Sequence, residues 1–95
     1  MIITLAIDKV APATYRAAAL HRGVAVCEAG AYASIAEAIR EEAAAVPEGF
    51  AYFIEPRYHG FSAGTVTLQK AQADANELAD RLMQLVAVSH AVSNT

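Results

Sequence analysis

The segment Phe50–Thr65 reads FAYFIEPRYHGFSAGT and contains five of the seven aromatic residues of this 95-residue chain. Aromatic and β-branched residues favour strands, so the sequence predicts one strand over 50–55 and a returning strand over 61–69. The stretch from Pro56 to Gly60 is predicted to be a turn or a bulged connection, because proline and glycine both favour turn conformations. This strand pair indicates that the second half of the chain contributes to a sheet.

A helix is predicted before this strand pair. Ser34 followed three residues later by Glu37 is a capping box, in which each side chain can bond the free backbone N–H of the other residue. Apolar residues then recur at helical spacing until Pro47, which predicts a helix over about 34–46. Four acidic residues are expected mostly on a solvated face of this region: Glu37, Glu41, Glu42 and Glu48.

A second helix is predicted after the strand pair. Asp74 with Glu77 repeats the cap pattern, and leucines at three- and four-residue spacing predict a helix over about 74–89. Glu77 and Arg81 are four residues apart and are expected to form an ion pair along this helix. We expect the leucine seam to pack against the sheet rather than to form a dimer zipper.

The N-terminal third predicts three strands. Apolar residues alternate with smaller or polar ones over 3–8, as in a half-buried strand. Strands over 14–20 and 24–28 are joined by His21-Arg22-Gly23, a short connection with glycine that favours a hairpin. Cys27, the single cysteine, lies in the later strand and is interpreted as a small buried hydrophobe.

Together these elements predict an α+β fold. The predicted order is β-β-β-α-β-β-α, with an antiparallel sheet of four to five strands and two helices on one face. The length of 95 residues suits a single domain, 1–95, with a frayed tail at about 91–95. A weak internal repeat agrees with this arrangement, because His21-Arg22-Gly23 and Tyr58-His59-Gly60 each precede a capped helix.

Part of this pattern resembles a known fold. The piece over 15–45 resembles the HicB-type antitoxin fold, in which a three-stranded sheet is followed by a capped helix and another strand. The resemblance rests on the turn at Gly23 and on Ser34, Glu37 and Ala38. The chain lacks the aromatic and proline-rich second strand of that family, and its second helix lies outside the family's minimal pattern. The resemblance therefore implies an order of elements, and we carry no activity or partner over from it.

Composition narrows the class of protein. Apolar residues make up 56% of the chain and charged residues 18%, which excludes a disordered tail and indicates that a partner covers some apolar surface. A homodimer is the simplest such assembly. The main alternative is a small regulatory or nucleic-acid-associated protein, which would need Arg22, Arg57 and Lys70 to converge on one face. The net charge of −3 disfavours nucleic-acid binding.

The sequence also predicts where the protein acts. The N-terminus has no basic leader, and no stretch approaches the roughly 20 apolar residues of a membrane span. A single cysteine permits no internal disulfide, which suits a reducing compartment. We therefore expect a cytoplasmic protein without membrane contact.

A formal catalytic motif lies in the opening segment. Gly60-Phe61-Ser62-Ala63-Gly64 matches G-x-S-x-G, the pattern that presents a nucleophilic serine between a strand and a helix. A strand rather than a helix is predicted after it, and the downstream acids and His90 satisfy the triad order only formally. A serine hydrolase using Ser62 is the least favoured hypothesis, and the two glycines are interpreted as shaping a hairpin.

The residues around the same turn form the predicted binding site. Arginine and tyrosine combine an apolar body with strong hydrogen-bonding groups and are typical of contact surfaces. The predicted site is Tyr52, Arg57, Tyr58, His59 and Phe61. The histidines have no metal-ligand spacing and no phosphate-binding glycine motif is present, so we expect neither a metal nor a cofactor. The sequence favours a non-enzymatic homodimer that uses the 50–65 hairpin for contact, with another protein as a possible partner.

Overall fold

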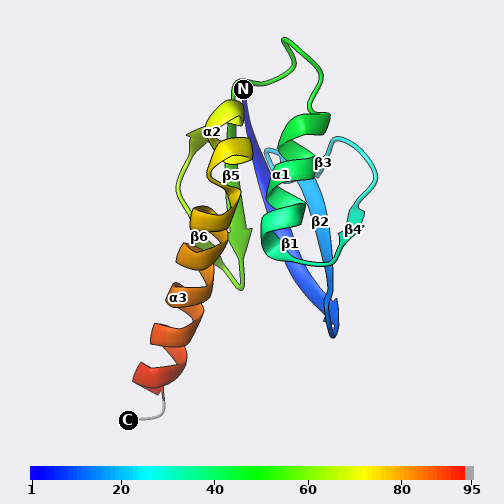
Figure 1. Cartoon of the computed structure of the whole chain (residues 1–95). Coiled ribbons are helices and arrows are strands. Elements are labelled where there is room, and N and C mark those ends of the chain that lie inside the picture. Colours follow the sequence, from blue (N-terminus) through cyan, green and yellow to red (C-terminus); the bar gives the residue numbers. More distant parts are fainter. Residues whose placement is uncertain (94–95) are drawn as a thin grey trace.

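The fold is α+β, as the sequence predicts. The computed structural model describes residues 1–93, and Figure 1 shows the helices of this part on one side of the sheet. In these residues the elements are β1 (Ile2–Ala11), β2 (Thr14–His21), β3 (Val24–Ala25), β4 (Gly30–Tyr32), α1 (Ile35–Ala45), β5 (Phe53–Tyr58), β6 (Phe61–Ser62), β7 (Val66–Thr67), α2 (Leu68–Ala73) and α3 (Ala75–Ser93). The two predicted helices are thus present as α1 and α3, with the short α2 added between them.

The sheet is mixed. Its strands run in the order β3-β2-β1-β5-β6, with β4 also paired to β2 and β7 to β5. β1 and β5 are parallel, with Ile3 opposite Ile54 and Ile7 opposite Tyr58, whereas the other pairs are antiparallel. The prediction of an antiparallel sheet is therefore wrong for β1 and β5. The connection between these strands includes α1, and a crossover of this kind allows the chain to return in the direction of β1.

The core lies between one face of this sheet and the helices. Side chains alternate between the two faces of a strand, and one alternating set is buried beneath the helices: Ile3, Leu5, Ile7, Ala17, Ala19, Ile54, Pro56 and Tyr58. The alanines of β2 are small, which lets α1 pack close to the sheet, and α1 contacts both β1 and β2. We call this side of the sheet the covered face.

α1 forms where the capping signal predicts it. The Ser34 hydroxyl accepts a hydrogen bond from the Glu37 backbone N–H at 3.0 Å, which satisfies one of the unpaired donors at the helix start. The core side of the helix carries Ile35, Ala38, Ile39 and Ala43. Glu42 corrects the prediction of a solvated acidic face, because it lies on the buried side and is only 8% exposed.

The predicted strand over 61–69 is shorter than expected. β6 and β7 are two residues long each, and Gly64, with φ of +91°, lies in the loop between them. The chain turns into α2 at Leu68, and the Thr67 hydroxyl accepts a hydrogen bond from the Lys70 backbone N–H at 3.1 Å. The run Gln69–Ala73 consists of strong helix formers, and this local propensity outweighs the strand pattern that ends at Leu68.

α3 packs its first half against the rest of the molecule. Leu78 and Leu82 are buried, so the expected contribution of the leucine seam to the core is confirmed there. The predicted pair of Glu77 with Arg81 is wrong, because the Arg81 guanidinium donates to the Ala63 carbonyl at 2.8 Å instead. α3 continues to Ser93, so the expected frayed tail is helical up to this residue, and its last part, 94–95, lies outside the described residues.

The hairpin turns are tighter than predicted. Arg22-Gly23 and His59-Gly60 have positive φ at both residues, near +52° and +80° in each turn, which is the signature of a type I′ turn. The strand predicted over 50–55 accordingly lies at 53–58, and Pro56 is a buried residue of β5 rather than part of a turn.

The strand predicted over 24–28 ends after two residues. β3 stops at Ala25, and Cys27 lies beyond it as an exposed free thiol. The interpretation of this cysteine as a buried hydrophobe is therefore wrong. The chain has already left the sheet at this point, so the alternation of a strand no longer determines which side chains are buried.

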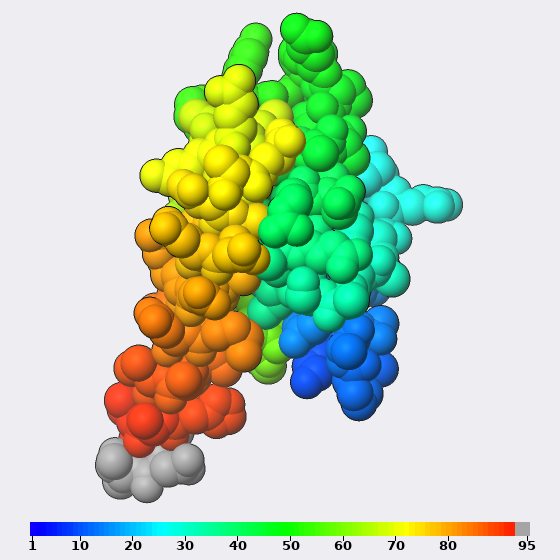
Figure 2. Space-filling view, viewed as in Figure 1, coloured from blue at the N-terminus to red at the C-terminus, as the bar shows by residue number. Residues whose placement is uncertain are grey.

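The molecule is elongated along α3. Its principal extents are 46 × 24 × 24 Å, and Figure 2 shows the C-terminal part of α3 extending beyond the body. The accessible surface is 5739 Å², against about 5,200 Å² expected for a compact monomer of this mass. In residues 1–93 no helix combines the length and apolar character needed to cross a membrane.

Candidate functional site

The face of the sheet opposite the helices is a candidate surface for contact with a partner. None of the helices described in residues 1–93 packs on it, and we call it the open face. Strand alternation and register assign these side chains to it: Ile2, Thr4, Ala6, Asp8, Arg16, Ala18, Leu20, Phe53, Glu55, Arg57 and Ser62. Apolar groups lie on the open face even though nothing in residues 1–93 forms a covering layer over it.

The centre of the open face is flat because its side chains are small. Ala6 lies opposite Ala18 on β2 and Arg57 on β5, and Thr4 lies opposite Leu20 and Glu55. One end of the face is apolar and more prominent, since Ile2 is 49% and its neighbour Phe53 is 42% exposed. A flat apolar centre permits the close approach of a second sheet, which packs about 10 Å away.

A shallow depression of about 370 Å³ crosses this face towards the β5–β6 turn. Thr4, Ala6 and Leu20 line its sheet side, and Asp8, Arg57 and His59 line its end. The depression therefore combines small apolar groups with one acidic and one basic side chain. Such a mixture suits contact with a polar and apolar surface of another protein.

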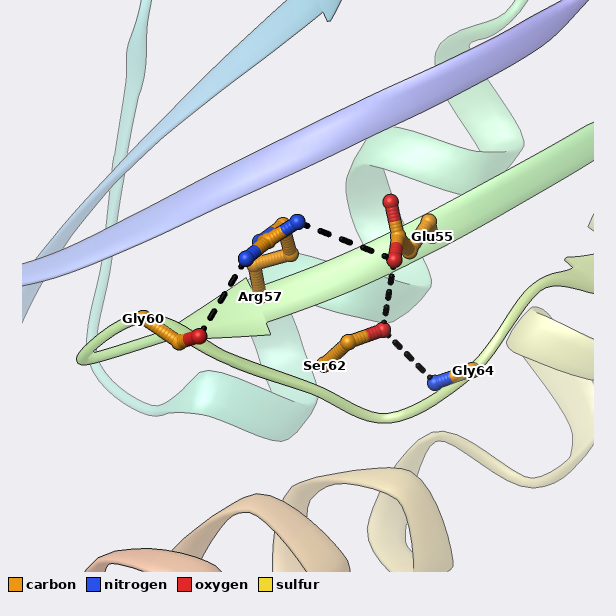
Figure 3. A network of polar contacts seen from close by, with 5 residues as sticks. All are labelled: Glu55, Arg57, Gly60, Ser62 and Gly64. Carbon is orange, nitrogen blue, oxygen red and sulfur yellow. Dashed lines mark hydrogen bonds and ion pairs between the residues drawn. The ribbon is translucent and has the colours of Figure 1, made fainter.

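A polar network stiffens the edge of the open face (Figure 3). The Arg57 guanidinium donates to the Gly60 carbonyl at 3.2 Å and lies 3.9 Å from the Glu55 carboxylate. The same carboxylate accepts a hydrogen bond from the Ser62 hydroxyl at 2.7 Å, and Ser62 accepts one from the Gly64 N–H at 3.0 Å. These contacts tie the loop after β6 to β5 and fix the direction of the Arg57 side chain.

The same network bears on the serine hydrolase hypothesis. The Ser62 hydroxyl is hydrogen-bonded to Glu55, and within residues 1–93 no histidine is hydrogen-bonded to it. The segment after Ser62 is a loop followed by β7, so the strand-to-helix turn of a nucleophilic serine is not formed. The arrangement therefore supports the structural role of this motif in shaping the hairpin.

The structure separates the five residues of the predicted site. Arg57, Tyr58 and His59 line the depression together. Phe61 lies opposite Tyr58 and is half-buried against the core. Tyr52 lies before the other end of β5 and is 67% exposed. The binding role of these residues stays a prediction, and the geometry brings three of the five to one place.

Tyr58 is held by other aromatic rings. Its ring makes edge-to-face contacts with Tyr15, at a centroid distance of 6.1 Å, and with His59, at 4.6 Å. Burial raises the pKa of Tyr58, and the nearby Tyr15 and Asp8 raise it further. The phenol therefore stays neutral at physiological pH, and its ring packs in the core beneath the turn.

The basic residues of the nucleic-acid alternative do not share a face. Arg57 belongs to the open face, whereas Lys70 is on α2, which packs over the covered side. Arg22 lies in the β2–β3 turn. Within residues 1–93, no cluster of three or more His, Cys, Asp or Glu side chains has an arrangement that could hold a metal ion.

The sequence missed the residues at the centre of the open face. Thr4, Ala6 and Ala18 carry little chemistry of their own, so neither motif nor composition marks them. The available signal was the alternation in β1, which places a second set of side chains on the side away from Ile3 and Leu5. Comparison with protein-family models, with curated proteins and with solved structures finds no match to this chain. The candidate site therefore rests on geometry.

Proposed function

We propose that the protein is a non-enzymatic interaction module that forms a homodimer through its open face. The observation that supports this is a sheet face with a small apolar centre and with no covering helix in the described residues. The β5–β6 hairpin contributes Phe53, Glu55, Arg57 and Ser62 to this face, so the predicted role of the hairpin in contact is retained. A two-fold axis would place each open face against its copy.

The charges around the apolar centre suit such a symmetric contact. Asp8 and Glu55 are acidic, whereas Arg16 and Arg57 are basic, and all four project from the open face. A two-fold contact brings the same patch against itself, so a face with one sign of charge would repel its copy. The mixture of both signs allows acidic groups of one copy to meet basic groups of the other.

The size of the face predicts a weak dimer. Three long strands about 4.8 Å apart, with rows of six steps of about 3.3 Å, and the two-residue edge strands β3 and β6 give each copy roughly 350 Å² of projected contact. Two copies would bury roughly 700 Å² in total, which is below the range of stable complexes. We therefore expect a dissociation constant in the micromolar range or weaker.

Sedimentation velocity from about 10 µM to about 1 mM tests the proposal, because this range brackets a weak dimer. The wild-type mass should rise with concentration from the monomer value of 10.0 kDa towards twice that value. Ala18→Glu places a larger, charged side chain at the flat centre of the contact, where a copy would have to remove it from water, and should hold the protein at the monomer mass.

Ala44→Glu is the matched control, since it adds the same side chain at an exposed position of α1 on the other side of the molecule. It should leave the self-association of the wild type unchanged. A wild type that stays at 10.0 kDa at every concentration would contradict the proposal. Equal self-association of Ala18→Glu and wild type would show that a different surface is used.

The proposal includes a cytoplasmic location. Cys27 is exposed and free, and a thiol of this kind persists reduced in the cytosol, where glutathione and thioredoxin keep cysteines from oxidising. Fractionation of cells that express a tagged chain from its own promoter tests this part separately.

A further inference from the structure

A cavity of about 240 Å³ lies between the covered face of the sheet and the C-terminal end of α1. Ile3, Leu5 and Ile54 line its sheet side and are almost completely buried. Val26 and Phe50 also line it and are 38% and 40% exposed, so the cavity reaches the surface between them. Its lining is apolar and its opening carries exposed apolar groups that an occupant would cover.

One charged side chain lines this cavity in the described part of the chain. Glu42 projects from α1 into an otherwise apolar lining and is only 8% exposed. A carboxylate taken out of water to this extent is costly unless a partner stabilises it. The Glu42 carboxylate therefore lies beside a cavity lining that is mostly apolar and offers it few hydrogen-bond donors.

The neighbouring tyrosine stabilises this carboxylate only in part. Burial raises the pKa of Tyr32 to about 12, and the charge of Glu42 and a hydrogen bond to it contribute to the rise. Tyr32 is therefore neutral at physiological pH, and its hydroxyl group can donate a hydrogen bond to the Glu42 carboxylate. A neutral donor leaves the negative charge of the carboxylate uncancelled.

We propose that this cavity binds a small primary amine that carries an apolar body. The ammonium group would pair with the Glu42 carboxylate, and the apolar body would lie against Ile3, Leu5 and Ile54. An apolar cavity of about 150 Å³ is enough to hold benzene, so this larger cavity has room for a ring with a short aminoalkyl arm. This inference concerns the covered face and does not rest on the dimer.

The charge of Glu42 discriminates between ligands of the same shape. An ammonium group gains a hydrogen bond in which the donor and the carboxylate acceptor are both charged, whereas an alcohol gains one in which only the acceptor is charged. A carboxylate ligand is repelled, because like charges in a low-dielectric site oppose each other. The expected order of affinity is therefore amine, then alcohol, then acid.

Titration of the wild type with 2-phenylethylamine, 2-phenylethanol and 3-phenylpropanoate tests this order, with amide NMR shifts as the measure of binding. We expect the amine to bind about tenfold more tightly than the alcohol, because its positive charge adds an attraction to the carboxylate. The shifts should be centred on the strands and helix that line the cavity. The acid should bind most weakly.

Glu42→Gln keeps the size of the side chain and removes its charge. It should reduce amine binding to about the level of the alcohol and weaken alcohol binding much less. Glu41→Gln, at the exposed neighbouring position of α1, is the control and should keep the preference of the wild type. If Glu42→Gln still prefers the amine to the alcohol, the proposal that Glu42 recognises the ammonium group is overturned.

The wild type also provides a measurement that needs no variant. Cys27 lines the cavity and is exposed, so an occupant should slow its reaction with a thiol reagent such as dithionitrobenzoate. The expected result is slower labelling in the presence of 2-phenylethylamine and unchanged labelling with 3-phenylpropanoate. Absence of binding by all three compounds, or equal binding of amine and acid, would overturn the proposal.

Discussion

Individual residues set the geometry of the two tight turns. Gly60 has φ of +79°, and among the described residues an added Cβ would meet no atom within 4 Å. Replacement of this glycine therefore probes the backbone conformation without a steric clash. The neighbouring His59, with φ of +53°, already bears the strain of a left-handed conformation.

Gly60→Ala should lower the free energy of unfolding by about 1–2 kcal/mol, because a Cβ is unfavourable in the left-handed region. Urea unfolding followed by circular dichroism measures this change. Gly60→Asn is the control and should cost clearly less, since asparagine tolerates this conformation. Equal stability of Gly60→Ala and wild type would mean that the turn is of another type.

At the scale of elements, α3 is attached to the sheet by more than its leucines. The Arg81 guanidinium donates to the carbonyl of Ala63, a residue that is 2% exposed in the loop after β6. The Ala63 N–H in turn donates to the Pro56 carbonyl at 2.9 Å. Arg81 thus joins α3 to the loop after β6, and the hydrogen bond between Ser62 and Glu55 joins the same loop to β5.

Arg81→Met should lower the free energy of unfolding by about 1 kcal/mol, because a charge-assisted hydrogen bond to a buried carbonyl is lost while much of the apolar stem remains. Chemical denaturation measures the loss. Glu77→Gln should change stability by less than about 0.5 kcal/mol, since the structure gives Arg81 a different partner. A larger effect of Glu77→Gln would support the ion pair that the sequence predicts.

At the scale of the molecule, β1 is the central strand. It is hydrogen-bonded to β2 on one side and to β5 on the other, and its side chains reach the core and the open face alternately. The pairs at the margins are short, since β3, β6 and β7 have two residues each. The free energy of local opening is therefore expected to decrease from β1 towards the strands at the edges of the sheet.

Amide hydrogen exchange measured by NMR tests this order. The amides of β1 from Ile3 to Ile7 should exchange most slowly, at rates set by global unfolding, and those of β3 and β7 should exchange fastest among the strands. Protection of β3 that matches or exceeds that of β1 would contradict the strand order.

Local signals explain what the sequence could predict. The Ser34 cap and the leucine spacing around Leu78 and Leu82 are contained within single helices, so the positions of α1 and α3 followed from them. The two glycine turns were predicted for the same reason. The parallel pairing of Ile3 with Ile54 joins residues about fifty positions apart, and no local pattern encodes it.

The candidate sites depend on the same non-local information. Ala6 and Ala18 are compatible with a core, a helix contact or an open face. Which of these environments they occupy depends on the face of the sheet against which the helices pack. Glu42 resembles any helix-surface glutamate in sequence, and its burial follows from the place of α1 above the sheet. Arg57 was predicted as a site residue because arginine is typical of contact surfaces, a property that can be recognised from the residue type alone.

The parallel pairing of β1 with β5 has a consequence for synthesis on the ribosome. β1 and β2 can pair once residue 21 has emerged, but the second edge of β1 must wait for residue 58. At about 5–20 residues per second this interval is roughly 2–7 s. During this time the edge exposes unpaired N–H and C=O groups and can accept a strand from a neighbouring nascent chain. Slower translation of the segment before β5 should therefore increase strand-swapped oligomers and aggregates, whereas the completed sheet no longer offers this edge.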